Sequence, residues 1–507
     1  MKFQELSTMQ SQSTNPQIDR SHPYVDGRLK LMLIDGEWKP SVTGKTFQSI
    51  DPSTGAMLAE VALGGREDIE LAVSAARKAF EGPWSRFKPF ERQQILLKLA
   101  DLVDRNYEEL ARLDSLDYGG ALSRTLPRKR RHVGLLRFYA GLATNITGQT
   151  IENSIPGEAF SYTLKEPVGV VGGIFAWNAP LDMMVWKIAP VLATGCTIVV
   201  KPPTEAALTP LRFAELLLEA GVPPGVVNVV PGAAEAGAAL AEHPGVDKIT
   251  FTGSTATGQA IVRASAGNLK RVTVELGGKS PDIVFADADL DAAVPAAAMA
   301  VFANAGQVCA AGTRLFVHRS IHEEFAARVA AFARQLKVGD SMDPKTEMGP
   351  LISARQMDRV LGYIESGRLE GARLLQGGVR VQEGAAAGGF FVQPTVFSEV
   401  TDDMKIAREE IFGPVASIFS FDTVEEVIAR SNASPYGLAG GVWTRDVTVA
   451  HRVARGLKAG SVWVNSYSAM DPAVPFGGYK MSGYGRESGA QHLEAFLETK
   501  SVTFKLA

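Results

Sequence analysis

The chain has 507 residues, of which 46% are hydrophobic and 21% are charged, and its formal net charge is −3. A chain of this length needs two or more domains, because a single hydrophobic core stops growing at about 250–300 residues. The near-neutral charge excludes the overall electrostatic signature of a nucleic-acid or membrane-surface binder, and no apolar run is long enough to span a membrane.

The N-terminal segment and the cysteines indicate the compartment in which such a chain works. Residues 1–28 are polar and lack the apolar core of a signal peptide, so we expect a disordered tail. The two cysteines, Cys196 and Cys309, exclude a disulfide framework and favour a reducing compartment, the cytoplasm. Seven histidines without a CxxC or HExxH spacing predict no metal site.

Ordered structure is expected from residue 29. Residues 29–38 form a strand-like apolar segment that Asp35-Gly36 interrupts. Two helices with one apolar face each follow, since hydrophobic residues recur there at helical spacing. These residues are Ile69, Ala72, Val73, Ala76 and Phe80 in the first helix, and Ile95, Leu99 and Leu102 in the second.

Apolar strands alternate with helices from about residue 168. We predict strands at residues 168–175, 196–201, 226–230, 248–252 and 271–275, and helices at residues 183–192, 208–220, 235–242 and 257–266. Continuous apolar strands separated by helices predict a parallel sheet covered on both faces, which right-handed crossovers wind into a doubly wound domain.

A second α/β pattern covers residues 282–480, with strands predicted at residues 315–318 and 461–465 and a helix at 321–335. Residues 382–390 have the small, glycine-rich composition of a surface loop. The terminal residues 501–507 alternate in polarity like a strand. A strand without a local partner is expected to pair elsewhere, for example with another subunit.

The segment from Phe251 to Gly258 has the residues of a phosphate-binding turn between a strand and a helix. Gly253 permits a sharp turn, Ser254 or Thr255 can cap the helix, and the free N–H groups of the helix start attract phosphate. The glycine spacing differs from GxGxxG, so a plain capped turn is an equally good interpretation of these residues alone.

Lys201 and Glu205 follow the end of another predicted strand, where Pro202-Pro203 stops the strand from continuing. At the ligand-binding edge of a doubly wound sheet, both side chains can hydrogen-bond ribose hydroxyls. A carboxylate there also repels a 2′-phosphate, which favours NAD over NADP. Taken alone, the two residues are better explained as a surface ion pair.

Cys309 and Glu275 are the candidate reactive groups. Small residues and glycines surround Cys309, which leaves room for a ligand to reach a nucleophilic sulfur. Cys196 starts an apolar strand and fits a buried packing role instead. Glu275 ends an apolar strand before two glycines, so it is either paired with a cation or poised for catalysis. Spacing along the chain does not place it beside Cys309.

Together these motifs resemble the aldehyde dehydrogenase superfamily. The matching segments are GQVCAAGT, VELGGKSP, FTGSTATG, FAWNAP, EEIFGPV and PFGGYKMSGYGRE, and the resemblance runs from about Leu31 to the C-terminus. It points to the NAD(P)-dependent hydrolytic, non-acylating branch. The resemblance implies an α/β fold with a Rossmann-like cofactor domain (residues 29–148 and 168–277), a second α/β catalytic domain (278–481) and a small oligomerisation arm (149–167 and 497–507).

The resemblance also implies roles for individual residues. In catalysis, Cys309 resembles the nucleophile, Glu275 the general base, Asn178 the amide that holds the oxyanion together with the Cys309 N–H, and Lys187 a supporting lysine. The residues that resemble cofactor ligands are Trp177 beside the pocket, Lys201 and Glu205 at the adenosine ribose, Gly253 and Ser254 at the pyrophosphate, and Glu410 and Phe412 at the nicotinamide ribose and ring.

The implied reaction is the oxidation of an aldehyde to a carboxylic acid with NAD, or NADP, through a thiohemiacetal and a thioester on Cys309. Glu275 indicates hydrolysis of the thioester, because transfer to coenzyme A would need no water-activating carboxylate. The implied assembly is a homodimer or homotetramer that takes a small aldehyde and binds no nucleic acid or membrane. The alternative, an inactive structural or binding protein on the same fold, is disfavoured because Cys309, Glu275 and Asn178 are all present.

Several residues resemble the lining of a substrate tunnel and suit an apolar or aromatic aldehyde, namely Arg131, Asp182, Met183, Trp186, Val308, Met470 and Phe476. The basic run at residues 128–131 is best explained as a solvated helix face. The sharper hypothesis puts Arg131 at the tunnel mouth, where it would favour an anionic aldehyde. Asp182 would instead favour a cation or contact water, so the sequence leaves the charge preference open.

Overall fold

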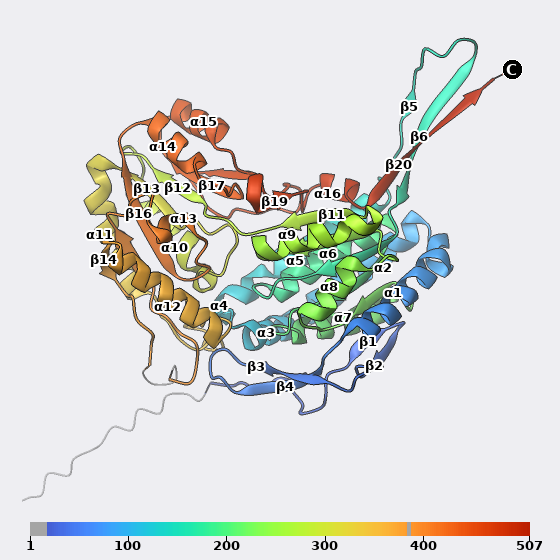
Figure 1. Cartoon of the computed structure of the whole chain (residues 1–507), viewed down its shortest axis with the longest axis horizontal. Coiled ribbons are helices and arrows are strands. Elements are labelled where there is room, and N and C mark those ends of the chain that lie inside the picture. The colour runs from blue at the N-terminus through green and yellow to red at the C-terminus, as the bar shows by residue number, and fades with distance from the viewer. Residues whose placement is uncertain (1–17, 383–386, 507) are drawn as a thin grey trace, which may run out of the picture.

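Two mostly parallel β-sheets organise the chain into two α/β bodies, and a long hairpin-like arm extends from one of them (Figure 1). These features come from a computed structural model, which describes residues 18–382 and 387–506. The observed layers of helices and sheets agree with the α/β class predicted from the sequence.

The first sheet contains the five predicted strands in the order β11-β10-β7-β8-β9, all parallel. They span Val170–Ile174 (β7), Thr197–Lys201 (β8), Val227–Val229 (β9), Lys248–Thr252 (β10) and Arg271–Glu275 (β11). Residues of the central strands are buried on both faces, so these strands are continuous apolar runs that sequence patterning locates within one or two residues.

Antiparallel strands close both edges of this sheet. On one edge, β1 (Met32–Ile34) pairs with β9 and forms a hairpin with β2 (Glu37–Lys39), which turns at the predicted Asp35-Gly36 break. On the other edge, β19 (Gly483–Tyr484) returns from the C-terminal part of the chain and pairs with β11. A separate hairpin is formed by β3 (Thr46–Ile50) and β4 (Met57–Ala62).

Helices cover both faces of the first sheet, and each face has its own apolar core. One face carries α2 (Pro89–Arg105), α5 (Lys129–Ala143), α6 (Pro180–Thr194) and α7 (Leu208–Ala220), and the other carries α1 (Arg66–Glu81), α8 (Ala234–Glu242) and α9 (Thr255–Ala264). This layout is the predicted doubly wound one. The sequence did not predict α3 (Tyr107–Tyr118) or the short α4 (Leu122–Thr125), and it indicated only the basic first turn of α5.

The second sheet has the order β14-β15-β16-β13-β12-β17-β18 and is parallel except for the β14 edge. Its strands are β12 (Pro281–Val284), β13 (Arg314–His318), β14 (Arg373–Gln376), β15 (Thr395–Ser398), β16 (Val415–Phe421), β17 (Ala439–Trp443) and β18 (Ser461–Val464). The helices of this body are α10 (Leu290–Phe302), α11 (His322–Gln335), α12 (Ala354–Leu369), α13 (Lys405–Arg408), α14 (Val424–Asn432) and α15 (Val447–Gly456). The predicted strands and helix of this region match β13, β18 and α11 within one residue.

The arm consists of β5 (Thr150–Ile151), β6 (Ala159–Pro167) and β20 (Leu497–Lys505). Strand β20 pairs with β6 of the same chain over its whole length, from Leu497 opposite Pro167 to Lys505 opposite Ala159, and its expected addition to a neighbouring subunit stays a prediction. The short helix α16 (Gln491–Glu494) packs on α6 and immediately precedes β20. It therefore places the start of β20 beside the edge of β6 at the base of the arm. The predicted hairpin at residues 150–167 therefore has a third strand.

Part of the expected disordered tail is packed against the body. The ring of His22 is buried and its Nε2 lies 3.0 Å from the carbonyl oxygen of Glu109. Arg20 forms ion pairs with the buried carboxylates of Asp51 and Asp340. Residues 18–28 are ordered because these polar contacts fix them to both α/β bodies. The prediction for residues 1–17, and part of the loop predicted at 382–390, lies outside the described residues.

None of the helices in residues 18–382 and 387–506 combines the length and the apolar composition that crossing a bilayer requires.

Candidate active site

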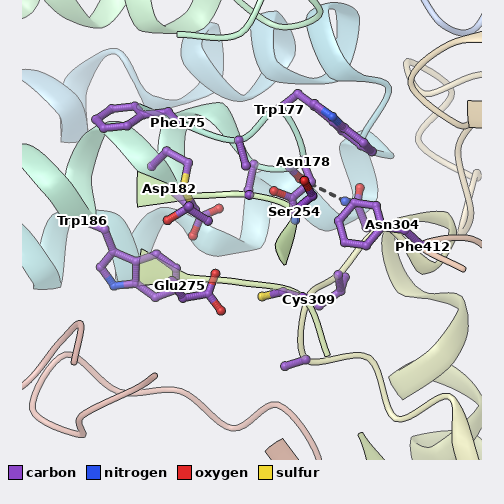
Figure 2. Close-up of a pocket in the computed structure, with 18 of the residues that line it drawn as sticks. Phe175, Trp177, Asn178, Asp182, Trp186, Ser254, Glu275, Asn304, Cys309 and Phe412 are labelled. Atoms are coloured by element: carbon purple, nitrogen blue, oxygen red, sulfur yellow. Dashed lines mark hydrogen bonds between the residues drawn. The ribbon is translucent and has the colours of Figure 1, made fainter. Parts of the chain in front are cut away.

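A cavity of about 750 Å³ opens at the carboxyl ends of β7, β8, β10 and β11, beside loops of the second body. In a doubly wound sheet, ligands bind at this edge, where the strand order reverses. The reversal falls at β7, whose neighbours are β8 on one side and β10 on the other. Most residues that the sequence singled out line this cavity (Figure 2).

The loop that carries Cys309 has a tightly defined shape. It follows α10, and both Asn304 and Ala305 adopt left-handed backbone conformations before it. Gly306 also has a positive φ of 72°, and a side chain there would overlap the carbonyl group of Gly413. The Cys309 side chain is partly exposed and lines the cavity. The glycine that the motif contains is therefore needed to position the thiol.

Asn178 is fixed to the same loop by hydrogen bonds. Its Nδ2 donates to the carbonyl oxygen of Gln307 over 3.0 Å, while the Nδ2 of Asn304 donates to the carbonyl oxygen of Asn178 over 3.0 Å (Figure 2). An amide nitrogen carries two hydrogens, so one N–H of Asn178 stays available to a ligand in the cavity.

Glu275 lies at the end of β11, and its carboxylate and the sulfur of Cys309 point toward one another (Figure 2). The side chain is buried, and its Oε1 has no hydrogen-bond partner within the described residues. Burial, together with the nearby charge of Glu487, raises the pKa of Glu275 to about 8, while the charge of Lys187 opposes the shift. A buried carboxylate with a free oxygen is poised to accept a proton near neutral pH.

The two thiols differ in their surroundings. Burial raises the pKa of Cys309 well above its ordinary value, and the adjacent charge of Glu275 acts in the same direction. Cys196 is fully buried, and its Sγ donates to the carbonyl oxygen of Phe496 over 3.3 Å. That position fits the packing role expected for Cys196.

Lys187 lies behind the cavity wall and not in its lining. Its side chain is buried, and Nζ donates to the hydroxyl of Thr250 over 3.1 Å and forms an ion pair with Glu487. Its charge nevertheless lowers the pKa of Glu275. Lys187 thus influences the cavity through its electrostatic effect on the pKa of Glu275.

The turn at the end of β10 has the predicted form. Ser254 is the N-cap of α9, and its hydroxyl accepts a hydrogen bond from the backbone N–H of Thr257 over 3.3 Å. Gly253 and Ser254 both line the cavity, so the open start of α9 faces it.

Only one of the two predicted ribose ligands faces the cavity. Lys201 lines it, donates to the carbonyl oxygen of Gly232 over 2.9 Å, and has its pKa lowered to about 8 by burial. Glu205 is not in the lining, and its carboxylate pairs with Arg355 at 3.2 Å. The surface ion pair that the sequence offered as the simpler interpretation is thus present at Glu205, although its partner comes from α12.

Glu410 and Phe412 come from the loop before β16. Glu410 Oε1 accepts a hydrogen bond from the backbone N–H of Gly278 over 3.2 Å, and burial raises the pKa of Glu410 to about 7. Phe412 has a left-handed backbone, and its ring meets Trp177 edge-on at 5.2 Å (Figure 2). Both rings line the cavity on the side of Cys309 that lies away from Trp186 in this view.

The predicted substrate side is a mostly apolar wall. Trp186 and Phe476 stack with centroids 6.2 Å apart, and Met183, Val308 and Met470 lie in the same lining. Phe175 and Trp463 add two aromatic rings that the sequence analysis missed.

The interpretation of Asp182 as a group for cationic substrates is wrong. Its carboxylate is buried and already engaged by Arg128 at 3.0 Å, Arg131 at 3.4 Å and His132 at 3.1 Å. The basic run is also only partly a solvated face, because Arg128 and Arg131 line the cavity whereas Lys129 and Arg130 are exposed.

Sequence reasoning missed several polar cavity residues, namely Arg128, Asn304, Arg355, Gln356 and Arg359. Asn304 precedes the Cys309 motif by a few residues and could have been found by extending that motif. Arg355 and Arg359 are four residues apart on α12 and share one helix face. Nothing in the sequence ties that face to the first sheet, so its part in the cavity could not be predicted.

A doubly wound sheet that opens onto a cysteine, a buried carboxylate and an anchored amide is typical of a dehydrogenase with a thiol nucleophile. Comparison with known proteins extends this class to a family. The chain belongs to the aldehyde dehydrogenase family, whose sequence profile matches residues 38–502.

Individual relatives are similar over almost the whole chain. The aldehyde dehydrogenase of Enchytraeus buchholzi is 50% identical, with 93% of this chain and 95% of that protein covered. Human mitochondrial aldehyde dehydrogenase is 49% identical, with 94% and 92% covered. The solved NAD+ complex of aldehyde dehydrogenase from Bacillus cereus has a TM-score of 0.92 and 49% identity, with 95% of this chain and 97% of that chain covered. The predicted activity is thereby confirmed: the enzyme oxidises an aldehyde to a carboxylic acid with NAD as its cofactor.

Proposed function

We propose that the enzyme is a hydrolytic aldehyde dehydrogenase in which Cys309 carries the acyl group and Glu275 activates the water that releases it. One observation supports this proposal most directly. The Glu275 carboxylate faces the Cys309 sulfur, its Oε1 has no hydrogen-bond partner among residues 18–382 and 387–506, and its pKa is raised to about 8. A carboxylate with these properties suits a general base.

The residues around the cavity fit NAD. The start of α9 with Gly253 and Ser254 offers backbone N–H groups to a pyrophosphate, and Lys201 and Glu410 offer polar groups to the two riboses. Trp177 and Phe412 supply apolar surface for the nicotinamide ring. Glu205, which is held by Arg355, acts at the outer edge of the adenosine ribose, where its charge favours NAD over NADP.

In the first half of the reaction, Cys309 loses its proton and its sulfur forms a bond to the aldehyde carbon. That proton is released to solvent. The carbonyl electrons move to oxygen, where the free N–H of Asn178 and the backbone N–H of Cys309 stabilise the charge. One such donor is typically worth about 3 kcal/mol. Bound NAD would supply the acceptor for the hydride that leaves this carbon, and a thioester would remain on Cys309.

In the second half, Glu275 removes a proton from water while the water oxygen attacks the thioester carbon. The same two N–H groups again hold the oxyanion. The carbon–sulfur bond then breaks, the carboxylic acid leaves, and Cys309 regains its thiol. Lys187 has a positioning role in this scheme, because its charge and its pairing with Glu487 tune the pKa of Glu275.

The two bodies divide these tasks between them. We assign residues 29–148 and 168–277 to a cofactor-binding domain and residues 278–481, which carry Cys309, to a catalytic domain. Residues 149–167 and 497–507 form an oligomerisation arm, on which Ile151, Phe160, Leu164 and Phe504 are 40–50% exposed. Large apolar side chains gathered on a projecting arm favour burial against a second copy, as in a homodimer or homotetramer.

The aldehyde itself is apolar or aromatic in this proposal. The stacked rings of Trp186 and Phe476, with Met183 and Met470 beside them, provide a planar apolar surface next to Cys309. Both cysteines are free thiols, which suits a reducing compartment such as the cytoplasm.

The experiment that tests the hydrolytic mechanism follows NADH production with benzaldehyde, cinnamaldehyde and hexanal. Wild type is expected to turn over with NAD, and Cys309→Ser is expected to lose activity. Glu275→Gln is expected to give one burst of NADH per active site and then almost no turnover, because the thioester forms and persists. Cys196→Ala removes the other thiol and serves as the control. Steady turnover by Glu275→Gln, or release of the acyl group only after coenzyme A is added, would contradict the hydrolytic assignment.

A further inference from the structure

Two arginines stand at the substrate side of the cavity without enough negative charge to balance them. Arg128 and Arg131 are 27% and 29% exposed, and both contact the buried carboxylate of Asp182. Burial alone would raise the pKa of Asp182, but His132, Arg131 and Arg128 outweigh that effect and hold the pKa far below its usual range. Asp182 is therefore ionised and supplies one negative charge against two guanidinium groups. The carboxyl group of Asp114 also acts on Arg128, but it is fully buried, and burial raises its pKa well above the ordinary value.

The other acids in the cavity do not neutralise the excess. Glu275 faces Cys309 and Glu410 is bound to the Gly278 N–H, and neither forms an ion pair with Arg128 or Arg131 in the described structure. A positive charge held away from bulk water attracts an anion more strongly than the same charge on an open surface. The substrate side therefore favours a negatively charged group.

Arg131 is held in place and still has unused donors. Its guanidinium lies 4.7 Å from the centroid of the Trp186 ring, which is itself fixed by stacking on Phe476 and by a 2.9 Å hydrogen bond from Nε1 to Ser488. Within the described part of the chain, Arg131 makes one ion pair and no hydrogen bond. A guanidinium has five N–H donors in a planar fork, which matches the two oxygens of a carboxylate.

We propose that Arg128 and Arg131 bind a carboxylate of the substrate, so that the preferred aldehydes carry a carboxylate at the end opposite the formyl group. The body between the two ends is planar and apolar, because it must lie along the rings of Trp186 and Phe476. This inference rests on the proposed function, since the formyl carbon of the same molecule must reach Cys309.

The test compares each acid with its uncharged amide of the same shape. The substrates are 4-carboxybenzaldehyde with 4-formylbenzamide, and the longer 4-formylcinnamic acid with 4-formylcinnamamide. Wild type, Arg131→Met, Arg131→Lys and Arg128→Met are assayed for kcat/KM with NAD. Arg130→Met is the matched control, because Arg130 lies in the same basic run but is exposed and outside the cavity.

For at least one pair, wild type is expected to prefer the acid, and Arg131→Met to lower the acid-to-amide ratio of kcat/KM. The drop should be about 10- to 100-fold, the effect of losing a hydrogen-bonded charge contact. Arg131→Lys should restore part of the ratio, and Arg130→Met should not change it. An equal ratio in wild type and Arg131→Met, or an equal loss in Arg130→Met, would overturn the proposal.

Two further measurements keep the outcome clear. Arg128→Met removes the nearest partner of Asp182, so its kinetic result is interpreted only if its melting curve matches that of wild type. The Arg131 variants test the proposal without it. Binding of terephthalate and of terephthalamate to the unreacted enzyme is measured by calorimetry. If no aldehyde is oxidised, the proposed function fails. In that case, tighter binding of terephthalate that Arg131→Met weakens would still support the arginine pair, and equal binding of both ligands would refute it.

Discussion

The α-carbon of Gly277 faces the carboxylate of Glu410 so closely that a β-carbon at position 277 would overlap its oxygens. Gly277 follows the strand that carries Glu275, whereas Glu410 belongs to the second body. The double glycine of the motif therefore lets a loop of one body reach the edge of the other sheet.

Replacing Gly277 by alanine is expected to push the Glu410 carboxylate out of its position. We expect the Kd for NADH to rise roughly tenfold, equivalent to about 1.4 kcal/mol, if Glu410 contacts the nicotinamide ribose. Fluorescence titration with NADH measures this change. Gly267→Ala is the control, because nothing lies within 4 Å of the β-carbon it adds. An unchanged Kd in Gly277→Ala would remove Glu410 from the cofactor contacts.

Turnover is expected to depend on the protonation of Glu275. A general base works only as the carboxylate, and the pKa of Glu275 is raised to about 8. The rate of thioester hydrolysis should therefore rise about tenfold per pH unit below this value and level off above it. Single-turnover release of the acid between pH 6 and 10 checks the profile. A flat profile over this range would show that another group activates the water.

Alkylation of Cys309 reports on the same carboxylate in the absence of substrate. Burial is the main reason that the pKa of Cys309 is high, and the charge of Glu275 is the next. Glu275→Gln removes the second cause, so the midpoint of the pH dependence of iodoacetamide labelling should move to lower pH. Cys309→Ser should abolish labelling, since Cys196 is fully buried. A midpoint that moves upward would mean that Glu275 assists deprotonation more than its charge opposes it.

Asp182 is expected to be important for stability at neutral pH. Its pKa is lowered in the fold, so its contribution is complete above the unfolded pKa of about 3.9 and disappears only as the pH falls through the lower folded value. At pH 7, Asp182→Asn should cost about 3–5 kcal/mol, because Arg128 and Arg131 lose their common partner. Urea unfolding measures the loss. Asp101→Asn breaks the exposed pair with Arg137 and should cost far less. Similar losses in both variants would show that the buried cluster adds little.

The arm is expected to determine the oligomeric state. Phe504 is half exposed, lies opposite Phe160 in the β20–β6 pair and stacks on Tyr162 at 6.0 Å. A charge at this apolar surface disfavours burial against a second subunit, so Phe504→Asp should lower the mass measured by light scattering. Leu369→Asp, at an exposed leucine outside the arm, is the control. An unchanged mass for Phe504→Asp would place the subunit interface elsewhere.

The sequence predicts this fold best where burial is continuous. Strands β10 and β11 and helix α7 match their predicted bounds, because apolar runs and helical spacing are local signals. The partner of β20 could not be predicted in this way, since pairing with β6 depends on how the intervening chain returns. The tail contact of Arg20 with Asp51 and Asp340 likewise joins segments far apart in the sequence.

The candidate site shows the same limit. The types of Cys309, Glu275 and Asn178 suggest chemistry, but only the tertiary structure turns the carboxylate toward the thiol. The Arg128 contact with Asp182 was missed because it joins the helical turn before α5 to α6, and spacing along the chain does not bring these two segments together. The pair of Glu205 with Arg355 could not be predicted either, because the helix that carries Arg355 lies in the other body.

The short strand β19 has a consequence for the integrity of the enzyme. It covers the outer edge of β11 with residues that the chain adds only after building the second body. A protein cut after residue 481 would leave the backbone of Thr273 to Glu275 open to other strands, and self-association through that edge would compete with folding. The first sheet is thus completed only when the C-terminal part of the chain has been synthesised. Neither of the two α/β bodies that form the cavity is therefore expected to fold independently.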